Sequence, residues 1–376
     1  MRRHVTMTAA ALLGALAAAL LPVASAQAGP SSLQRKLARE TLASIVERVD
    51  QTTAYRYRAK DDRGALLDGL KVLQVDGTNL GLYHAPAKDG RFNVYVATSE
   101  DLITWTRRAT LDVGASQPTI ALLPSGGLVV AYEKVSLIEL GLGSLTDALD
   151  SVVGPILNSP KDRIRIRFRF YRTVDALLDG QFAREFTAPR RLSPTAEGTP
   201  SITKIKLKRG LLSRSKIEVG LHYFADLDGN GTPDADRLAT AVLTGFNTWQ
   251  ARAAPAQDES LLHAQFLHAP YTQPPRGNIG DRDQVIIDGV RLELQEAQYV
   301  PGDYSSWRPF LIDPRGGVVP RPLQIVTNGG STSFGNPTAT VLTAPSGKPA
   351  VLITMYVFGE GAAPGENGPL IYYRER

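Results

Sequence analysis

Residues 116–133 read SQPTIALLPSGGLVVAYE, and this stretch contains the unit that decides the fold. A polar cluster with a proline leads into an apolar run, a PSGG turn, a second apolar run and a final glutamate. Two apolar runs joined by such a turn are typical of a β-hairpin. The same order of features recurs in residues 198–223, 280–296 and 335–356, and more weakly in residues 67–84. Imperfect repetition at this scale predicts stacked structural units.

Several repeats continue into a later strand with an aromatic residue near its end, as in VYVATSEDLITW, LATAVLTGFNTW and YSSWRPFL. The closing stretch GPLIYYRER is expected to pair with the early TAYRYRAK and to join the two ends of a ring. The sequence therefore predicts an all-β fold, a five-bladed β-propeller preceded by an N-terminal helix. A β-sandwich is the alternative, but it leaves the repeated spacing unexplained. The expected blades are residues 68–112, 113–191, 192–255, 276–320 and 325–376, within a propeller domain of residues 55–376.

Residues 1–28 have the composition of a secretory signal peptide. Arg2 and Arg3 precede the apolar run TMTAAALLGALAAALLPV, and the small residues Ala24 and Ala26 suit cleavage. An uncleaved membrane anchor is the alternative, but no polar stop-transfer pattern follows. No other segment is long and apolar enough to span a bilayer, so we expect a secreted, extracellular protein without a membrane partner in its mature form.

Residues 29–54 are expected to form a helical segment ahead of the propeller. Ala38, Leu42 and Ile45 recur at helical spacing, and Ser31 or Ser32 is a suitable N-cap. A cleaved or flexible pro-segment is the alternative interpretation.

Composition narrows the function further. The formal net charge of +5 falls to about +3 when Arg2 and Arg3 are removed, which is too small to indicate a nucleic-acid partner. The chain has no cysteine, which excludes disulfides and thiolate metal sites. Its 34 glycines and 25 prolines suit the many turns of an all-β domain.

Two stretches of the second unit are unlike the other units. Residues 134–161 are expected to form a loop insertion with a short amphipathic helix at 145–157, on a face where propellers commonly bind partners. Residues 163–170, RIRIRFRF, alternate strictly, which predicts an outer strand with one face in water.

Polar residues stand at both ends of the apolar hairpins. The innermost strand of each blade starts at one face and its partner returns to that face, so these ends converge near the axis. The strand starts are Asp68, Gln117, Thr199, Arg282 with Asp283, and Asn336. The strand ends are His84, Glu133, His222, Glu296 and Tyr356. We expect these side chains to ring one pocket.

Carboxylates give this pocket its chemistry. Glu133 and Glu296 form a candidate pair for glycoside hydrolysis, in which one carboxyl protonates the leaving oxygen and the other acts as base or nucleophile. Asp68 and Asp283 are further candidates for the base, or for tuning the pKa of the acid. For each carboxylate the alternative is an inter-blade hydrogen bond to the backbone or a salt bridge.

The other ring residues are predicted to bind substrate. Arg282 suits a carboxylate or the hydroxyls of a substrate, or a pairing with its acidic neighbours. The histidines suit hydrogen bonds better than metal ligation, because no HxH or HExxH spacing accompanies them. This predicted binding set is His84, Gln117, His222, Arg282, Asn336 and Tyr356.

Residues 226–234, DLDGNGTPD, form a candidate calcium loop. Oxygen ligands at positions 1, 3, 5 and 9, with glycine at position 6, suit a structural Ca²⁺ ion. Arg237 stands where an EF-hand has its bidentate glutamate, and the loop instead resembles the nine-residue calcium hairpins of integrin-type propellers. An Asx-rich turn without metal is the alternative. The predicted ligands are Asp226, Asp228, Asn230, Asp234 and the carbonyl group of Thr232.

Two motifs carry a family resemblance. Residues 99–105, SEDLITW, are similar to the S-x-D-L-x-x-W strand of five-bladed propeller glycosidases and resemble a truncated Asp-box of sialidases. QPTI, followed by GGLVVAYE, looks like the hairpins that both groups share. The resemblance covers about residues 65–376 and implies an acidic site at the axis, acting on arabinan, xylan, fructan or sialoside linkages.

The resemblance assigns a functional role to few individual residues of this sequence. Glycoside hydrolase family 43 places its base on the first strand of the first blade, which matches Asp68 here. The third blade begins with Thr199, where that family has an aspartate, and Arg282 with Tyr356 does not assemble the arginine triad of a sialidase. We therefore expect a secreted carbohydrate-active propeller, a glycoside hydrolase with an oligo- or polysaccharide substrate. A non-catalytic carbohydrate- or protein-binding propeller is the alternative.

Overall fold

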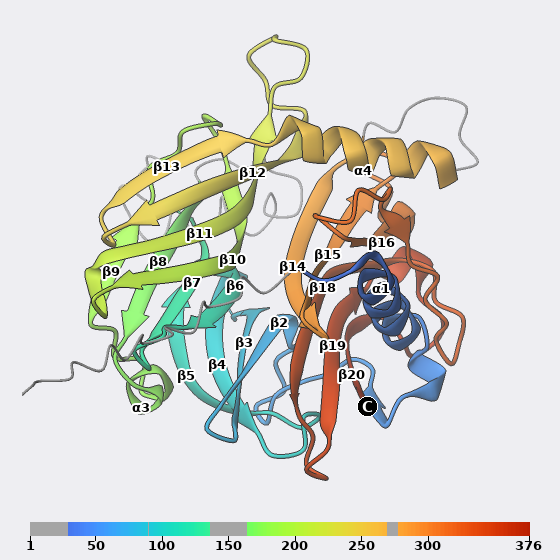
Figure 1. The fold of residues 1–376 in the computed structure, drawn as a ribbon, viewed down its shortest axis with the longest axis horizontal. Coiled ribbons are helices and arrows are strands. Elements are labelled where there is room, and N and C mark those ends of the chain that lie inside the picture. The colour runs from blue at the N-terminus through green and yellow to red at the C-terminus, as the bar shows by residue number, and fades with distance from the viewer. Residues whose placement is uncertain (1–28, 89, 136–163, 269–276) are drawn as a thin grey trace, which may run out of the picture.

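The computed structural model describes residues 29–88, 90–135, 164–268 and 277–376. The strands within them form five four-stranded antiparallel sheets arranged around a common centre (Figure 1), which confirms the predicted five-bladed propeller. The predicted signal peptide and most of the predicted insertion at 134–161 lie outside the described residues. No helix of the described ranges is both long and apolar enough to cross a lipid bilayer.

Each of the first four blades is built from strands consecutive in the chain. Blade 1 contains β2 (Asp68–Val75), β3 (Thr78–Pro86), β4 (Phe92–Ser99) and β5 (Thr106–Val113). Blade 2 contains β6 (Ala115–Leu122), β7 (Leu128–Val135), β8 (Ile164–Tyr171) and β9 (Arg184–Thr187). Blade 3 contains β10 (Glu197–Lys208), β11 (Leu211–Ala225), β12 (Ala235–Thr244) and β13 (Thr248–Ala253). Blade 4 contains β14 (Ile279–Ile287), β15 (Val290–Gln298), β16 (Trp307–Ile312) and β17 (Arg321–Pro322).

Blade 5 joins the two ends of the propeller. It contains β18 (Phe334–Thr343), β19 (Pro349–Val357) and β20 (Gly368–Glu375), and its outermost strand is β1 (Ala54–Arg56) from the start of the chain. Ala54 pairs with Tyr373 and Arg56 with Ile371, as the sequence predicted. This pairing gives the last blade its fourth strand and closes the ring by joining the two ends of the chain in one sheet.

Helices cover parts of the ring. Helix α1 (Ser32–Val46) lies beside blades 4 and 5, and α4 (Pro255–His268) runs from blade 3 across to blade 4 (Figure 1). The short α3 (Val174–Leu178) links β8 to β9. Short 3-10 turns lie at η1 (Val49–Gln51), η3 (Tyr304–Ser306) and η4 (Gly359–Gly361).

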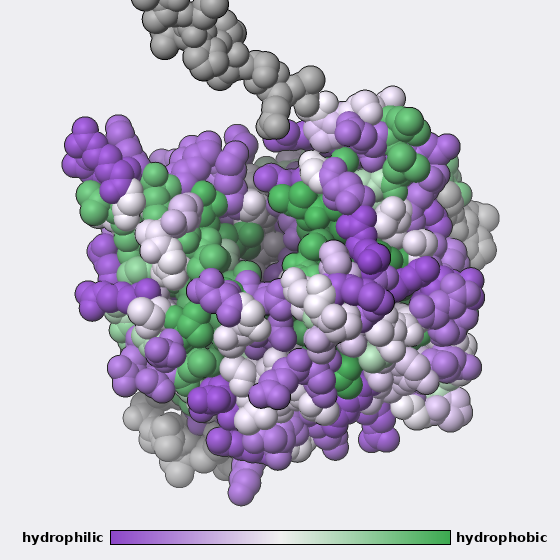
Figure 2. Space-filling view, turned by 60° about the horizontal axis from the view of Figure 1, so that its bottom comes forward, coloured by the Kyte–Doolittle hydropathy of each residue, from purple (hydrophilic) through white to green (hydrophobic). Residues whose placement is uncertain are grey.

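Hydrophobic clusters fill four of the five interfaces between neighbouring blades. Each cluster combines apolar side chains of the two facing sheets, for example Val130 with Leu82, or Val351 with Leu294. The remaining interface, between blades 3 and 4, has a smaller cluster around α4, where Leu261 packs against Leu238 and Ile279. The turned surface in Figure 2 is largely hydrophilic, with hydrophobic patches around a hollow near its middle.

The structure corrects the prediction that residues 163–170 form an outer strand with a wet face. They lie mainly in β8, the third strand of blade 2, and β9 covers its outer edge. Arg169 is only 8% exposed and lies 3.3 Å from Asp112, which also binds Lys134 and Arg167. The alternation does mark two faces, but a buried carboxylate keeps the polar face out of water.

The SEDLITW motif has a structural role. The Asp101 carboxylate accepts hydrogen bonds from the backbone N–H groups of Ile103 and Thr104, and Ser99 Oγ accepts one from Leu102. Trp105 is 2% exposed and packs with Leu70 and Tyr83 in the core between blades 5 and 1. The motif therefore stabilises a turn and an interface at a distance from the axis.

Helix α1 packs as an integral part of the fold. Ser31 caps its N-terminus, and Leu42 and Val46 are fully buried against blades 4 and 5. Arg35 and Arg39 both bind the buried Asp313 of blade 4, at 2.6 and 2.8 Å. This packing supports a structural helix over the alternative of a flexible pro-segment.

Truncating a buried residue of α1 tests that assignment. Leu42→Ala removes a fully buried side chain, and we expect the free energy of unfolding to fall by about 2–5 kcal/mol in urea denaturation. Leu33→Ala is the matched control, because Leu33 is 62% exposed and should leave stability unchanged. Equal midpoints for both variants and the wild type would show that α1 does not contribute to the core.

Candidate functional site

The same β-bulge occurs at the inner end of every blade. At this point the innermost strand has one residue more than the paired segment of its partner strand. The extra residue lies between Ser116 and Thr119 on β6 and between Gly198 and Ser201 on β10. The other three blades have the same register shift. A proline follows the bulge residue in three blades, where it interrupts no ladder hydrogen bond. The bulge residues are Gly69, Gln117, Thr199, Asp281 and Asn336.

These bulges explain the polar clusters that open each sequence repeat. Gln117, Thr199 and Asn336 have φ values of 49°, 46° and 50°, in the left-handed region that few non-glycine residues adopt. Residues from all five bulges line a water-sized cavity of about 30 Å³ on the axis, with Pro337 contributing from blade 5. The repeat therefore encodes a β-bulge that brings the start of every blade toward the centre.

Glu133 connects blade 2 to the bulge of blade 3. Its Oε1 accepts hydrogen bonds from the backbone N–H of Thr199 at 2.8 Å and from the Thr199 hydroxyl at 3.0 Å. Its Oε2 accepts one from Ser116 at 2.8 Å. Gly198 leaves room for this carboxylate, because a Cβ there would overlap with Glu133. The inter-blade hydrogen bond that the sequence left as an alternative is thus present.

Glu296 makes the corresponding connection from blade 4 to blade 5. Its Oε2 accepts from the backbone N–H of Asn336, and its Oε1 accepts from the backbone N–H of Asp281 at 3.0 Å. Gly280 leaves room for the carboxyl group in the same way as Gly198 does in blade 3. Glu296 is 5% exposed. Both predicted catalytic glutamates are therefore also ties between blades.

Asp68 heads a polar chain through blades 5, 1 and 2. Its Oδ1 accepts from Asn336 Nδ2 at 3.0 Å, and its Oδ2 lies 3.4 Å from His84 Nε2. His84 Nδ1 accepts from the backbone N–H of Gln117 at 3.3 Å, and Gln117 Nε2 donates to Asn336 at 3.3 Å. The structure brings these four predicted residues together. The Asp68 side chain is 19% exposed, against 12% for that of Glu133.

His222 and Tyr356 complete the ring of strand ends. His222 Nε2 contacts the Thr199 hydroxyl, and its Nδ1 lies 3.1 Å from Asp236. Tyr356 lies 5.4 Å from Phe358, measured between ring centres, and burial raises the pKa of its hydroxyl. Phe358 is also packed against Trp307 and the half-exposed Tyr304.

Phe358, with the aromatic residues packed around it, is a neighbour of Glu296 that the sequence analysis missed. A Cβ added at Gly335 would overlap with both Phe358 and Glu296, so the ring and the carboxyl group are neighbours. Apolar rings next to a few polar groups are typical of small-molecule sites. Their spread over loops of blades 4 and 5 concealed them in the sequence.

Two predicted residues line the axial cavity but have their main partners elsewhere. Asp283 binds Lys71 across the axis and accepts from the backbone N–H of Ala339 at 2.9 Å, so it neutralises a partly buried lysine. Arg282 points away from the axial set, into the interface with blade 3, where it donates to the carbonyl group of Ala239. Alternation along β14 separates these neighbours, since successive side chains point to opposite faces of a strand.

Asp281 occupies the bulge position that the sequence analysis assigned to its neighbours. Aligning Gly280-Asp281 with Gly198-Thr199 would have identified it. Burial raises the pKa of Asp281 well above its usual value, and the nearby Glu296 and Glu133 carboxylates add to this. Its Oδ1 is buried without a hydrogen-bond partner among the described residues. A protonated carboxyl group at the axis is the consequence.

Glu296 is perturbed in the same direction. Burial raises its pKa to about 7, against the lowering effect of the two backbone N–H donors. Carboxylates that share one desolvated site cannot all ionise at neutral pH, because like charges repel strongly there. The axial cluster therefore holds carboxyl groups that can release a proton near neutrality.

The predicted calcium loop lies on the surface between β11 and β12. Ligand atoms of Asp226, Asp228 and Asp234 lie within 4.8 Å of one another. Asp226 accepts backbone hydrogen bonds from Gly229 and Gly231 at 2.8 and 2.7 Å, which curl the loop around its carboxylate. Asn230 Oδ1 accepts from the N–H of Thr232 at 2.7 Å. Three clustered carboxylates on one tight loop are a donor set that suits Ca²⁺.

Comparison with known proteins identifies the fold. No family model and no curated protein matches the sequence. A solved structure described as an RGII complex has a TM-score of 0.54 at 10% identity, covering 91% of this chain and 96% of the other protein. One described as "Glycoside hydrolase" has a TM-score of 0.52 at 10% identity, with the same coverage of both proteins. A thermostable family-43 glycoside hydrolase has a TM-score of 0.49 at 10% identity, covering 85% and 92%.

The chain shares its fold with the RGII complex and with the structure described as a glycoside hydrolase. This confirms at the level of the fold the resemblance that the motifs indicated. At this identity the likeness extends to the architecture alone.

The raised pKa of Glu296 has a consequence for stability. Between its ordinary value of 4.5 and about 7, the folded protein holds a proton that the unfolded chain has released. This difference in bound protons stabilises the folded protein by roughly 3 kcal/mol. The stabilisation is complete below pH 4.5 and is lost as the pH rises through about 7. Chemical denaturation from pH 4 to 8 should show wild type losing more stability than Glu296→Gln. Parallel curves would contradict the raised pKa.

Proposed function

We propose that the protein is a secreted glycoside hydrolase whose active site is the axial carboxylate cluster. The observation that carries this proposal is a buried group of glutamates and aspartates from three blades, in which Glu296 has a pKa of about 7. An acid that is still partly protonated at neutral pH is what the protonation of a glycosidic oxygen requires. The aromatic residues beside Glu296 offer a surface for the apolar face of a sugar ring.

The roles of the carboxylates follow from their surroundings. Glu296 is the proposed acid, which donates its proton to the leaving oxygen as the glycosidic bond breaks. Asp68 is the proposed base, because its side chain is more accessible than that of Glu133 and its contacts are with Asn336 and His84. It would take a proton from the attacking water. Glu133, with three hydrogen bonds, is the alternative partner.

A non-catalytic carbohydrate-binding propeller is the second candidate. It is favoured by the backbone hydrogen bonds of Glu133 and Glu296, which give both carboxylates a structural reason to be there. In that case the ring of strand ends, with the aromatic residues around Phe358, would bind an oligosaccharide without cleaving it. A secretory signal peptide at residues 1–28 is part of the proposal in either case.

Substitutions at the axis distinguish these functions. With aryl-glycosides and plant polysaccharides as substrates, we expect Glu296→Gln and Asp68→Asn to lower kcat at least about a hundredfold. Glu133→Gln is the matched control. It should mainly lower the free energy of unfolding, by about 1–3 kcal/mol, because the amide keeps only one of the two oxygen acceptors of the carboxylate. The kcat/KM of the wild type should fall above about pH 7 as the acid ionises.

The outcomes separate the alternatives. Full activity in Glu296→Gln would remove Glu296 from the mechanism, and a large loss of kcat in a folded Glu133→Gln would make Glu133 the second catalytic group. Oligosaccharide binding without hydrolysis by the wild type would favour the non-catalytic propeller.

We also propose that the loop at 226–234 binds a structural Ca²⁺ ion. Asp226, Asp228 and Asp234 would supply carboxylates, with Asn230 and the carbonyl group of Thr232 completing the cage. The ion would rigidify the loop between β11 and β12 and would supply no catalytic step.

Calcium binding is testable without an activity assay. We expect calorimetry to detect one bound Ca²⁺ per protein molecule and thermal unfolding to shift upward with added Ca²⁺. Asp228→Asn removes one anionic ligand and should abolish both effects, whereas Asp288→Asn, at an exposed turn of blade 4, should retain them. An unchanged response in Asp228→Asn would contradict the proposal.

A further inference from the structure

The interface between blades 3 and 4 differs from the other four in the polarity of its two walls. On β14, Asp283, Val285 and Ile287 face blade 5, so Arg282 and Gln284 face blade 3. On β11, Ile217 and Val219 pack toward blade 2 in the same way, and Lys216 and Glu218 face blade 4. Burying these facing polar side chains would cost free energy wherever they lack hydrogen-bond partners, so we expect a hydrated gap between the two blades.

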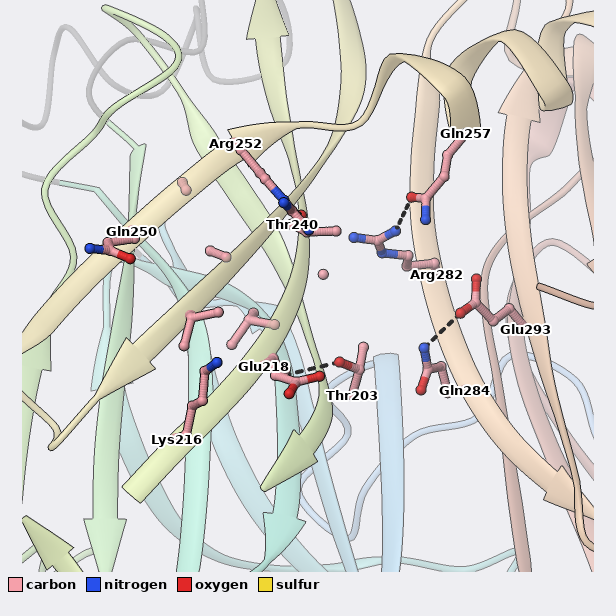
Figure 3. Close-up of a pocket in the computed structure, with 15 residues that line it drawn as sticks. Thr203, Lys216, Glu218, Thr240, Gln250, Arg252, Gln257, Arg282, Gln284 and Glu293 are labelled. Carbon is pink, nitrogen blue, oxygen red and sulfur yellow. Dashed lines mark hydrogen bonds between the residues drawn. The ribbon is translucent and has the colours of Figure 1, made fainter. Parts of the chain in front are cut away.

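That gap is a cleft of about 640 Å³ (Figure 3). Its volume lies within the usual range for ligand sites, about 300–1,000 Å³. Helix α4 lies over the cleft, and Gln257 on that helix reaches toward Arg282 (Figure 3). The polar lining consists of Thr203, Lys216, Glu218, Thr240, Gln250, Arg252, Gln257, Arg282, Gln284 and Glu293.

Arg282 is the unusual group in this cleft. It is 8% exposed and extends from β14 toward Thr240 and Arg252 on the opposite wall (Figure 3). Its guanidinium donates to Gln257 Oε1 at 3.0 Å and to the carbonyl group of Ala239. Within the described residues it has no ion pair, and its Nε has no hydrogen-bond partner. A buried cation is ordinarily paired with an anion, because desolvation of the charge is costly.

The backbone opposite is shaped around this guanidinium. A Cβ at Gly220 would overlap with three atoms of the Arg282 side chain, so only glycine at that position of β11 leaves room for it. Burial lowers the pKa of Arg282 from its usual value, and the charges of Glu293 and Asp258 oppose this shift only in part. The guanidinium thus has room made for it and an Nε without a hydrogen-bond partner among the described residues, so it can accept a further anionic partner.

We propose that the cleft between blades 3 and 4 is a second binding site, which takes an acidic sugar whose carboxylate contacts Arg282. The walls carry amide and hydroxyl groups, such as those of Gln250, Gln284 and Thr240. These groups can donate and accept hydrogen bonds and suit a ligand that is rich in hydroxyls. Glu218 and Glu293 also line the cleft and would repel a doubly charged phosphate more than a singly charged carboxylate. This site uses none of the axial carboxylates, so it does not depend on the proposed hydrolase activity.

Calorimetry with a matched pair of sugars tests this site. We expect wild type to bind glucuronate at least roughly tenfold more tightly than glucose, because a charge-assisted hydrogen bond is available only to the acid. Arg282→Gln should lose that preference and bind both sugars alike. Gly220→Ala keeps the charge but displaces the guanidinium, and should lose the preference as well. Arg172→Gln, at an exposed position of blade 2, is the matched control and should bind like wild type.

Further measurements distinguish this site from the axial cluster and from a general anion site. Glu296→Gln should bind glucuronate normally, because the axial cluster is not involved. Arg252→Gln, on the exposed opposite wall, should weaken glucuronate binding even if Arg282→Gln fails to fold. Acetate should bind more weakly than glucuronate, because it lacks the hydroxyls. The proposal is overturned if wild type binds no glucuronate at millimolar concentrations, if acetate or glucose binds as tightly, or if folded Arg282→Gln keeps the preference.

Discussion

A hydrogen bond from a bulge to the neighbouring blade organises the centre of this protein. Each bulge frees backbone N–H groups from the ladder, and a buried N–H group without an acceptor costs free energy. His84 accepts from Gln117, Glu133 from Thr199, and Glu296 from Asn336, each across a blade boundary. In these three cases the acceptor stands at the end of the second strand. These three strand ends are polar for this reason, and their hydrogen bonds tie neighbouring blades together near the axis.

The same interaction creates the chemistry of the axis. Carboxylates are strong acceptors for backbone N–H groups, and placing several at the centre of a propeller crowds negative charge in a desolvated space. The result is the raised pKa of Asp281 and Glu296. Part of this charge is balanced by Lys71, which binds Asp283. The structural role and the proposed catalytic role therefore reside in the same side chains, and only substitution with activity and stability measured together separates them.

The interface between blades 3 and 4 is open because polar side chains line it in place of apolar ones. Four interfaces are closed by apolar side chains from both sheets, whereas β11 and β14 present charged and amide groups to each other. Helix α4 closes part of this boundary with Leu261 and Ala264. On β11 the pattern was already visible in the alternation of KIEVG, but an alternating strand is ordinarily interpreted as one with a solvent-exposed face.

The sequence by itself determined the number of blades and the polar character of the strand ends. These properties are local, because a turn, an alternation or a proline at a bulge follows from neighbouring residues. Only the tertiary structure decided which polar residues meet. It joined Asp68 to Asn336 and His84, brought Lys71 to Asp283, and turned Arg282 away from the axis. One residue of register moves a side chain to the other face of its strand, and contacts across the axis join residues more than two hundred positions apart.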